Sequence, residues 1–545
     1  MNNILKHIIP AAALVLGTMG ITSCTGDLHV QPIDPNLQTE IQPEQLFNKC
    51  YANFGTSGNG GADGDCDVDG IDGGTSGLYR QYWNANELPT DEAICGWGDQ
   101  GIAEFVNNSY DASHPMLRGY YYRLCVGIAY CNQYLGQFAD HDATMNAEIR
   151  FLRAFQYYLL MDAFGNIPFA TVVSSENPVQ ASRQEMYNWL VGELKNIIGE
   201  GEDNSAVLAD PSVKTKGQTG YGRVDKAAAW LLLSRLYLNA EVYTGKAEWA
   251  NAAAYAKKVM DSPYKIFTGG NDTWTSYQQL FMGDNGKNGA QVEDVFPIIQ
   301  DGQRTTAYGV ALYLIASTYD ADMHSNPNDP TAVNGVSGQA WGGNRARPQL
   351  VRKFFPLDDA PEGESYQVAA AAGDDRALFN TVGRQLNVEN VSKFKEGFAV
   401  AKFTNFTTDG SATSDAKFPD MDVMMMRTAE AYLNYAEALT RQAGGTAPAE
   451  ALAALNVLRA RAHASTFPSA KLSNIADEWA REFYFEGMRR TTLIRFGQYG
   501  GNSTYNWQWK GGSYDGRSFA SFRNIYAIPS SDLTVNKNLV QNPGY

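Results

Sequence analysis

The stretch that decides the fold is 147-AEIRFLRAFQYYLLMDAFGNIPF-169. Its large apolar residues recur at steps of three and four, so they share one face of an α-helix: Ile149, Leu152, Phe155 and Leu159. Three more residues widen this face: Phe151, Ala154 and Tyr158. We therefore expect a mostly buried helix, with Arg150, Arg153 and Tyr157 on its other side. Such a helix needs partner helices to cover it.

Further segments with the helical period supply these partners. They cover residues 43–54, 118–139, 227–240, 248–260, 423–441, 449–464 and 472–496, and another helix begins at the capping box of Ser182 and Glu185. Alanines stand where two helices would approach closely: Ala429, Ala431, Ala436 and Ala438. The expected fold is mainly α, a tetratricopeptide-like scaffold of degenerate helical pairs.

The pattern changes between residues 268 and 420. Gly, Asn, Asp and Pro cluster there, helical periodicity fades, and short runs such as 295–299 are typical of strands. We expect one loop-rich insertion with short strands, laid across a scaffold made of residues 43–267 and 421–496. Ordered loops on a rigid scaffold are where binding residues concentrate.

The first residues have the features of a lipoprotein signal. Lys6 precedes a short apolar run at 8–19, and Ile21-Thr-Ser-Cys24 follows as a lipobox. We expect a signal peptide at 1–23, acylation of Cys24, a polar tether over 24–42 and a body over 43–545. The alternative is an ordinary secretory signal with a coincidental cysteine.

Composition excludes some functions and leaves others open. The 545 residues are 44% hydrophobic and 19% charged, as in globular proteins, and the net charge of −16 argues against a nucleic-acid partner. No nucleophile elbow, P-loop, dinucleotide fingerprint or HExxH motif is present. A glycosidase with two paired carboxylates stays open, because any two of the 59 acidic residues can meet in space.

Five cysteines remain when Cys24 is set aside: Cys50, Cys66, Cys95, Cys125 and Cys131. None forms a CxxC pair or has a histidine at ligand spacing, so we expect buried free thiols and no zinc.

A glycine- and aspartate-rich loop contains a DxDxDG sequence at Asp65, Asp67 and Asp69. Alternating carboxylates before a glycine can wrap a calcium ion. However, Ser76 stands where a bidentate Glu would be, and no helices flank the loop as in an EF-hand. A solvated acidic loop is the favoured interpretation, and no cofactor is expected to be required.

Two tryptophans lie in glycine-rich surroundings that offer little local packing. Trp97 lies between Gly96 and Gly98, and Trp341 precedes Gly342. A flat aromatic ring can stack on the apolar face of a sugar, with polar groups beside it. From the residues alone, each ring is either a ligand platform or a core anchor for its loop.

Several strings along the chain resemble the SusD/RagB family of outer-membrane nutrient-binding lipoproteins. They are 147–169, GRVDKAAAWLLLSRLYLNAEVYTG from Gly222, RTAEAYLNYAEAL from Arg427, LNVLRARA from Leu455, DEWAREFYFEGMRRTTLIRFG from Asp477 and the ending QNPGY. The resemblance implies a non-enzymatic, lipid-anchored protein that faces the outside of a Gram-negative cell. It would bind a glycan and pass it to a TonB-dependent barrel of the SusC type.

Other strings are similar to starch-binding members of that family, namely NELPTDE from Asn86, AGDDRAL from Ala372 and WKGG from Trp509. The resemblance implies an aromatic arc that follows a starch-type α-glucan. The residues carried over by local match are Trp97, Tyr308, Trp341, Arg80 and Gln100. Two rivals stay open: an interaction protein whose aromatics are core, and an anchored glycoside hydrolase.

Overall fold

The structure is a computed structural model that describes residues 41–64 and 66–545. The predicted signal peptide, Cys24, most of the tether and Asp65 lie outside the described residues. Residues 47–545 form one compact unit. In the described part of the chain, no helix combines the length and the apolar character needed to cross a membrane.

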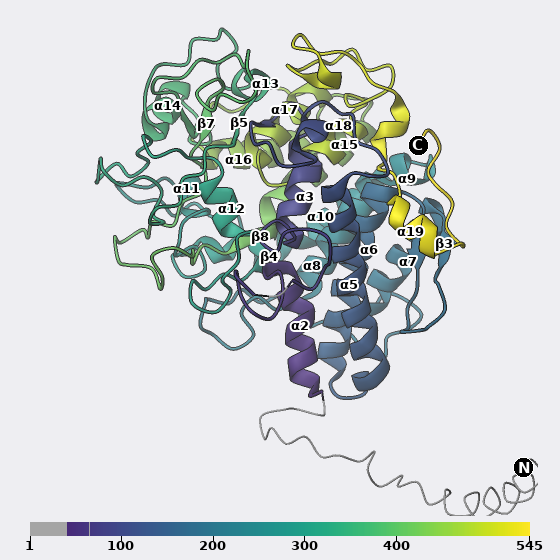
Figure 1. Ribbon diagram of the computed structural model, residues 1–545. Helices are drawn as coiled ribbons and strands as arrows, with labels where there is room; N and C mark the ends of the chain where they lie inside the picture. Colours follow the sequence, from purple (N-terminus) through teal and green to yellow (C-terminus); the bar gives the residue numbers. More distant parts are fainter. Residues whose placement is uncertain (1–40, 65) are drawn as a thin grey trace, which may run out of the picture. The chain divides into compact units, whose positions relative to one another are not determined.

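The scaffold is built from helices that pack in succession. They are α2 (Pro43–Gly55), α3 (Leu78–Glu87), α4 (Ile102–Val106), α5 (Pro115–Phe138), α6 (Ala143–Phe164), α7 (Arg183–Ile197), α8 (Lys226–Leu238), α9 (Ala240–Thr244), α10 (Trp249–Asp261), α15 (Thr428–Gln442), α16 (Ala449–Arg461), α17 (Leu472–Phe483) and α18 (Arg489–Arg495). Neighbouring pairs are α5 with α6, α6 with α7, α8 with α10, α10 with α15 and α15 with α16. The expectation of a mainly α fold of helical pairs is confirmed (Figure 1).

Helix α6 is more deeply buried than its sequence predicts. Every residue from Ala147 to Phe164 is buried, including the two arginines expected on the far side. Arg150 and Arg153 instead pair with Glu193 of α7, at 2.7 and 3.0 Å. The side of α6 that carries the two arginines is therefore covered as well, because a charged side chain can be buried when a partner carboxylate neutralises it. Gly165, at φ 72°, ends the helix as expected.

Two predicted helices need correction. Residues 423–427 form the strand β8 (Val423–Arg427), paired with β4 (Asp294–Ile298), and the helix α15 begins only at Thr428. All five strand residues are buried, and such a short apolar run carries no period that distinguishes a strand from a helix. The expected helix 472–496 is broken between α17 and α18, where Phe485 and Gly487 have φ of 64° and 78°.

The insertion contains only short elements, as expected. They are α11 (Ser276–Gln279), η2 (Ala290–Val292), β4, α12 (Ala311–Ala316), β5 (Asn344–Ala346), α13 (Pro348–Val351), α14 (Ser365–Ala372), β6 (Phe379–Asn380) and β7 (Ala399–Val400). In Figure 1 most of them lie to the left of the long helices. The chain closes with η3 (Lys510–Gly512), η4 (Ser521–Asn524) and α19 (Ser530–Val535). The boundaries of signal, tether, scaffold and insertion stay predictions.

The described residues form four antiparallel two-stranded sheets. Two of them join nearby segments, β2 (Ile167–Phe169) with β3 (Val179–Ala181) and β6 with β7, and two join distant ones, β4 with β8 and β1 (Ala93–Cys95) with β5. The β1–β5 pair matters most for the candidate site, because an aromatic residue lies just beyond each strand at the same end of the sheet.

Candidate binding site

Strand pairing brings the two glycine-flanked tryptophans together. In the β1–β5 sheet Cys95 lies opposite Asn344, and the amide of Gly96 donates to the carbonyl of Gly343 at 3.3 Å. Trp97 follows β1 and Trp341 precedes β5, so the antiparallel register places their rings 6.3 Å apart, inclined at 50°. Their adjacency follows from a pairing across some 250 residues rather than from local sequence.

The NELPTDE string holds β1 in place from inside the protein. Glu87 accepts hydrogen bonds from the amides of Gly487, at 2.6 Å, and Met488, at 3.2 Å. Asp91 accepts both Nε and an Nη of Arg489, at 2.6 and 2.7 Å. Burial opposes ionisation of Asp91, but Arg489 holds the pKa of this carboxyl well below its usual range. The string therefore bonds the end of α3 to the α17–α18 link and to the first residue of α18.

Gly343 allows the tryptophan ring to lie against the backbone. A Cβ at this position would stand 2.2 Å from Cε2 of Trp97, closer than two atoms can approach. Trp97 also donates from its indole nitrogen to the carbonyl of Trp341 at 3.4 Å. The Trp97 ring is thus held against the backbone of the residues that precede β5, and it remains half-buried.

The two tryptophans begin a strip of four rings. Tyr308 follows Trp341 at 6.4 Å and 50°, and Phe418 follows Tyr308 at 5.7 Å and 56°. All four side chains are half-buried. Each ring is inclined by 50–56° to the one before it, so the four rings do not lie in one plane. Such half-exposed rings offer apolar faces on which a sugar can stack.

Arg80 lies behind the strip. Its guanidinium carbon is 4.8 Å from the centre of the Tyr313 ring and 5.7 Å from that of Trp97. One of its terminal nitrogens donates to the carbonyl of Gly74 at 3.2 Å, whereas its Nε has no hydrogen-bond partner among the described residues. Arg80, Tyr308 and Trp341 line an open hollow of about 410 Å³.

Comparison with known proteins identifies the family of this chain. Over 579 aligned residues it is 39% identical to the starch-binding protein SusD of Bacteroides thetaiotaomicron, and the match covers 99% of each chain. A family model described as the SusD family matches residues 361–545. The chain belongs to the SusD family. Its relative is named as a binding protein, in agreement with the expectation that this chain is not an enzyme.

Solved structures show the SusD fold. Surface glycan-binding protein A from Bacteroides fluxus has a TM-score of 0.63 at 20% identity, covering 92% of this chain and 99% of its own. Surface glycan-binding protein A from Bacteroides thetaiotaomicron, solved with laminarihexaose, has a TM-score of 0.63 at 19% identity, with coverage of 92% and 98%. These likenesses establish the architecture of this SusD-family chain.

Four of the five residues carried over from the family resemblance meet in the structure. Arg80, Trp97, Tyr308 and Trp341 are neighbours, as the ring distances show. Gln100 is exposed in the turn before α4 and is not among the residues that line the hollow. A role for each in glycan binding stays a prediction.

The aspartate-rich loop forms one wall of the same hollow. Ala62, Asp63 and Gly64, with Asp72, Gly73 and Gly74, complete its lining. Asp63 accepts a hydrogen bond from the Tyr308 hydroxyl at 3.3 Å, and Lys417 donates to that hydroxyl at 2.6 Å. Sequence reasoning treated loop and aromatics as separate candidates and missed Lys417 and Phe418, although a basic–aromatic pair in the loop-rich insertion was a usable signal.

The calcium interpretation gains no support from the described part of the loop. Asp67 is paired with Lys49 at 2.8 Å and lies 3.5 Å from Arg123, so these cations already neutralise it. Asp69 is exposed, and Asp65 lies outside the described residues. Among the residues that the structure describes, no group of three His, Cys, Asp or Glu could hold a metal ion.

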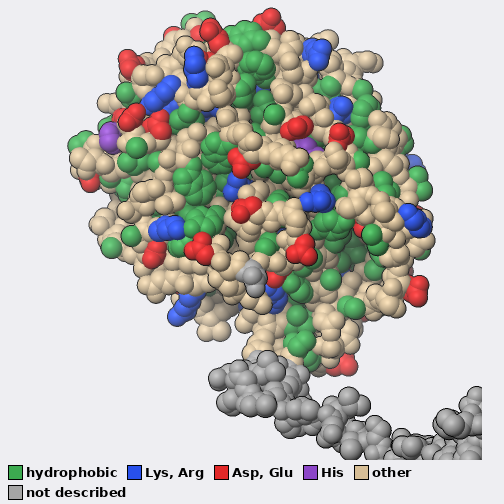
Figure 2. Space-filling view, in the orientation of Figure 1, with side chains coloured by type: hydrophobic (Ala, Val, Ile, Leu, Met, Phe, Trp, Pro, Cys, Tyr) green, Lys and Arg blue, Asp and Glu red, His purple; other side chains and the backbone are tan. Residues whose placement is uncertain are grey.

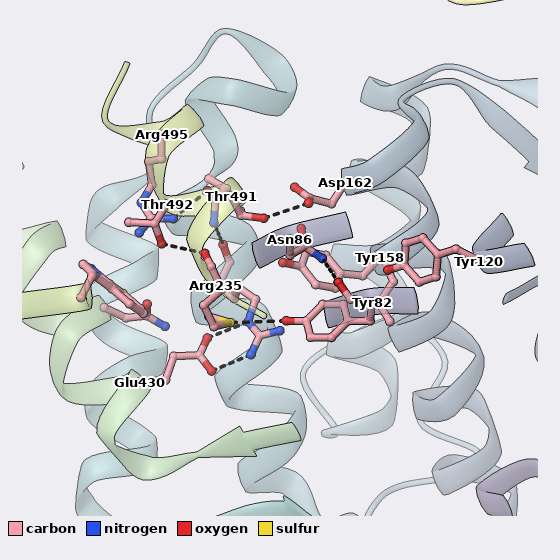
Figure 3. Close-up of a pocket in the computed structure, with 15 residues that line it drawn as sticks. Tyr82, Asn86, Tyr120, Tyr158, Asp162, Arg235, Glu430, Thr491, Thr492 and Arg495 are labelled. Carbon is pink, nitrogen blue, oxygen red and sulfur yellow. Dashed lines mark hydrogen bonds and ion pairs between the residues drawn. The ribbon is translucent and has the colours of Figure 1, made fainter. Parts of the chain in front are cut away.

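A second pocket lies inside the helical scaffold. It differs from the hollow in its volume and in the bonding of the polar groups that line it. Figure 3 shows it between Tyr82, Asp162, Arg235 and Glu430, whose polar groups bond to protein neighbours. Its volume of about 10 Å³ is enough for roughly one water molecule and far too small for a sugar ring. The surface in Figure 2 carries charges of both signs, interspersed over the visible face. The hollow has room for a sugar and two half-exposed rings in its lining, which this inner pocket lacks.

Proposed function

We propose that this SusD-family chain is a cell-surface protein that binds a glycan, with a starch-type α-glucan as its preferred ligand. The strip of Trp97, Trp341, Tyr308 and Phe418 carries the proposal, because rings that are inclined to one another can each stack on a different sugar unit of a helical α-glucan. Arg80 and the loop carboxylates offer hydrogen bonds to sugar hydroxyls beside the rings. The starch-binding relative, matched over nearly its whole length, supports the same ligand.

Binding to an open strip is expected to be weak. The hollow is open to solvent, so sugar hydroxyls exchange hydrogen bonds with water for hydrogen bonds with the protein, and little surface is fully desolvated. We expect micromolar or weaker dissociation constants, about −8 kcal/mol or less favourable. Weak binding suits a protein that passes its ligand on.

Affinity electrophoresis tests the ligand. The body from residue 43 onward is run in gels that contain amylopectin, laminarin or dextran. We expect retardation by amylopectin alone and its loss in Trp97→Ala. The matched control is Trp230→Ala, which removes a half-buried tryptophan of α8 outside the strip and should leave retardation unchanged. Retardation by laminarin alone would overturn the α-glucan assignment, and new reducing ends in the gel would overturn the non-enzymatic role.

Anchoring and delivery complete the proposal. Acylation of Cys24 would hold the body at the outer membrane, and a SusC-like TonB-dependent barrel would receive the glycan. Cys24→Ala should then release the protein into the soluble envelope fraction, while glycan retention by the purified body stays unchanged. Purification of the acylated protein should bring down a barrel of that class, and purification without one would contradict the delivery step.

A further inference from the structure

Two buried cysteines lie opposite each other where α2 passes α5. The helices run antiparallel, as their contacts show: Phe47 faces Tyr134, with ring centres 6.1 Å apart, and Arg123 donates to the Asn53 side chain at 3.4 Å. As the numbers rise along α2 they fall along α5. Cys50 is one turn beyond Phe47, and Cys131 is one turn before Tyr134. The register therefore places the two cysteines on facing positions.

Side chains from α2 and α6 pack against α5 at this point. Gly127 lies one turn before Cys131, and a Cβ there would stand 2.3 Å from Nδ2 of Asn53. Asn53 donates to Gln156 at 3.0 Å, and Gln156 in turn donates to Sγ of Cys131 at 3.7 Å. The absence of a side chain at Gly127 thus leaves room for Asn53, which lies one turn after Cys50, beside the turn of α5 that precedes Cys131.

The two thiols are close enough to influence each other. Cys131 raises the pKa of the Cys50 thiol, burial adds to this effect, and both side chains are completely buried. The other described cysteines lie elsewhere. Cys66 contacts the Ser76 hydroxyl at 2.8 Å, Cys95 lies in β1, and Cys125 lies nearer the start of α5. In the structure all five are thiols.

We propose that Cys50 and Cys131 form a disulfide when the chain folds after export. The proposal rests on the expected cell-surface location, because exported proteins meet an oxidising environment. One thiolate attacks the disulfide of a thiol–disulfide oxidase to give a mixed disulfide, and the second thiolate then displaces the enzyme. Two protons leave the cysteines, and the two electrons reduce the oxidase to its dithiol. The bridge fixes the first helix of the body to the long helix α5.

Thiol counting on the full chain from the cell envelope tests this bridge. The protein is denatured in an alkylating agent without reductant, digested and analysed by mass spectrometry. We expect alkylated Cys66, Cys95 and Cys125, a linked peptide pair that contains Cys50 and Cys131, and five alkylated cysteines after reduction. Only chains from which the signal peptide has been removed are counted, so a failure of export appears separately as uncleaved chain.

Two variants sharpen the result. Cys131→Ala should raise the number of alkylated cysteines before reduction from three to four, because Cys50 loses its partner. The matched control Cys95→Ala removes another buried thiol and should lower the number to two. Five alkylated cysteines in unreduced, processed wild-type protein would overturn the bridge, as would linkage of any other pair. Wild-type counting needs no variant to fold.

Discussion

Arg427 and Arg80 are both buried arginines next to aromatic rings, yet their surroundings differ. Arg427, at the end of β8, bonds to Glu293, Glu482 and Glu486 at 2.7–2.9 Å and lies 3.9 Å from the centre of the Phe483 ring. Arg80 has one backbone carbonyl, no carboxylate within ion-pair distance, and an Nε without a partner among the described residues. One is fully satisfied by the protein, and the other faces an open hollow.

The difference in partners indicates that Arg427 stabilises the fold, whereas Arg80 is available to bind a ligand. The carboxylates around Arg427 are shared with Arg376 and Arg461, which makes a closed network inside the scaffold. The network lies inside the scaffold, where no ligand reaches it. Arg80 has no carboxylate partner among the described residues and lines the hollow beside the strip of rings, where a ligand with hydroxyl groups can meet its guanidinium. The same residue type thus serves folding in one region and recognition in the other.

The largest effect is expected when the closed network is opened. Arg427→Met leaves Glu293, Glu482 and Glu486 short of a buried partner and should lower the free energy of unfolding by about 3–5 kcal/mol, measured by urea denaturation. Arg80→Met should cost about 1 kcal/mol, since it loses one backbone hydrogen bond, but should abolish retardation by the glycan. Equal losses of stability in the two variants would break the comparison.

Glu92 lies between these extremes, buried beside Glu87, Asp91 and Arg489. Burial raises the pKa of Glu92 to about 7, with Asp91 adding to the effect and Arg489 opposing it. The folded state therefore binds more protons than the unfolded state between pH 4.5 and 7, so stability falls as the pH rises through this range. Glu92→Gln removes this penalty. Its stability relative to wild type should rise by about 2–3 kcal/mol from pH 5 to pH 8.

Urea titrations of both proteins at several pH values measure this difference. His114, whose pKa burial lowers to about 4, makes stability rise with pH between about 4 and 6.5, but it contributes equally to both proteins and cancels. If the difference in stability between Glu92→Gln and wild type stays constant from pH 5 to 8, Glu92 is ionised throughout this range. Its charge would then be compensated by neighbours, as that of Arg427 is.

Gly343→Ala tests the placement of the open site without changing any functional group. The added Cβ would stand 2.2 Å from the Trp97 ring and must displace it. We expect glycan affinity to fall about tenfold, some 1.4 kcal/mol, with little change in stability. Gly98→Ala is the matched control, because a Cβ there meets nothing within 4 Å. Unchanged retardation in Gly343→Ala would mean that the position of the Trp97 ring is unimportant for binding.

Tyr308→Phe should have the smallest effect. It keeps the ring in the strip but removes the hydroxyl that links Asp63 and Lys417. We expect a two- to fivefold weaker affinity, about 0.5–1 kcal/mol, measured by isothermal titration with a soluble maltooligosaccharide. Tyr308→Ala should weaken binding much further. If the two variants behave alike, the hydroxyl and not the ring contributes the binding energy.

Much of the scaffold could be predicted because its signals are local. Helix α6 and the capping box at Ser182 follow from spacing and from residue types a few positions apart. The sequence is less informative where distant partners decide the outcome. Glu193 of α7 allows Arg150 and Arg153 to be buried, and pairing with β4 turns residues 423–427 into a strand.

The site could be predicted only in part for the same reason. Glycine neighbours and family-like strings pointed to Trp97, Trp341, Tyr308 and Arg80, and these residues do meet. Nothing local joins Phe418 or the aspartate-rich loop to them, because three-residue strands and loop contacts leave no periodic trace. Gln100 was selected by adjacency to Trp97, and the chain turns it outward.

The contacts between the NELPTDE string and the α17–α18 link also affect the order in which parts of the chain fold. Glu87 meets Gly487, 400 positions later, and the carbonyl of Ala85 accepts a hydrogen bond from the Tyr526 hydroxyl, 441 positions later. Contacts of such long sequence separation form late and slowly, because a long loop must close before they give any stabilisation. The tryptophans are therefore synthesised long before they are positioned. Sugar capture is among the last properties that the folding chain acquires.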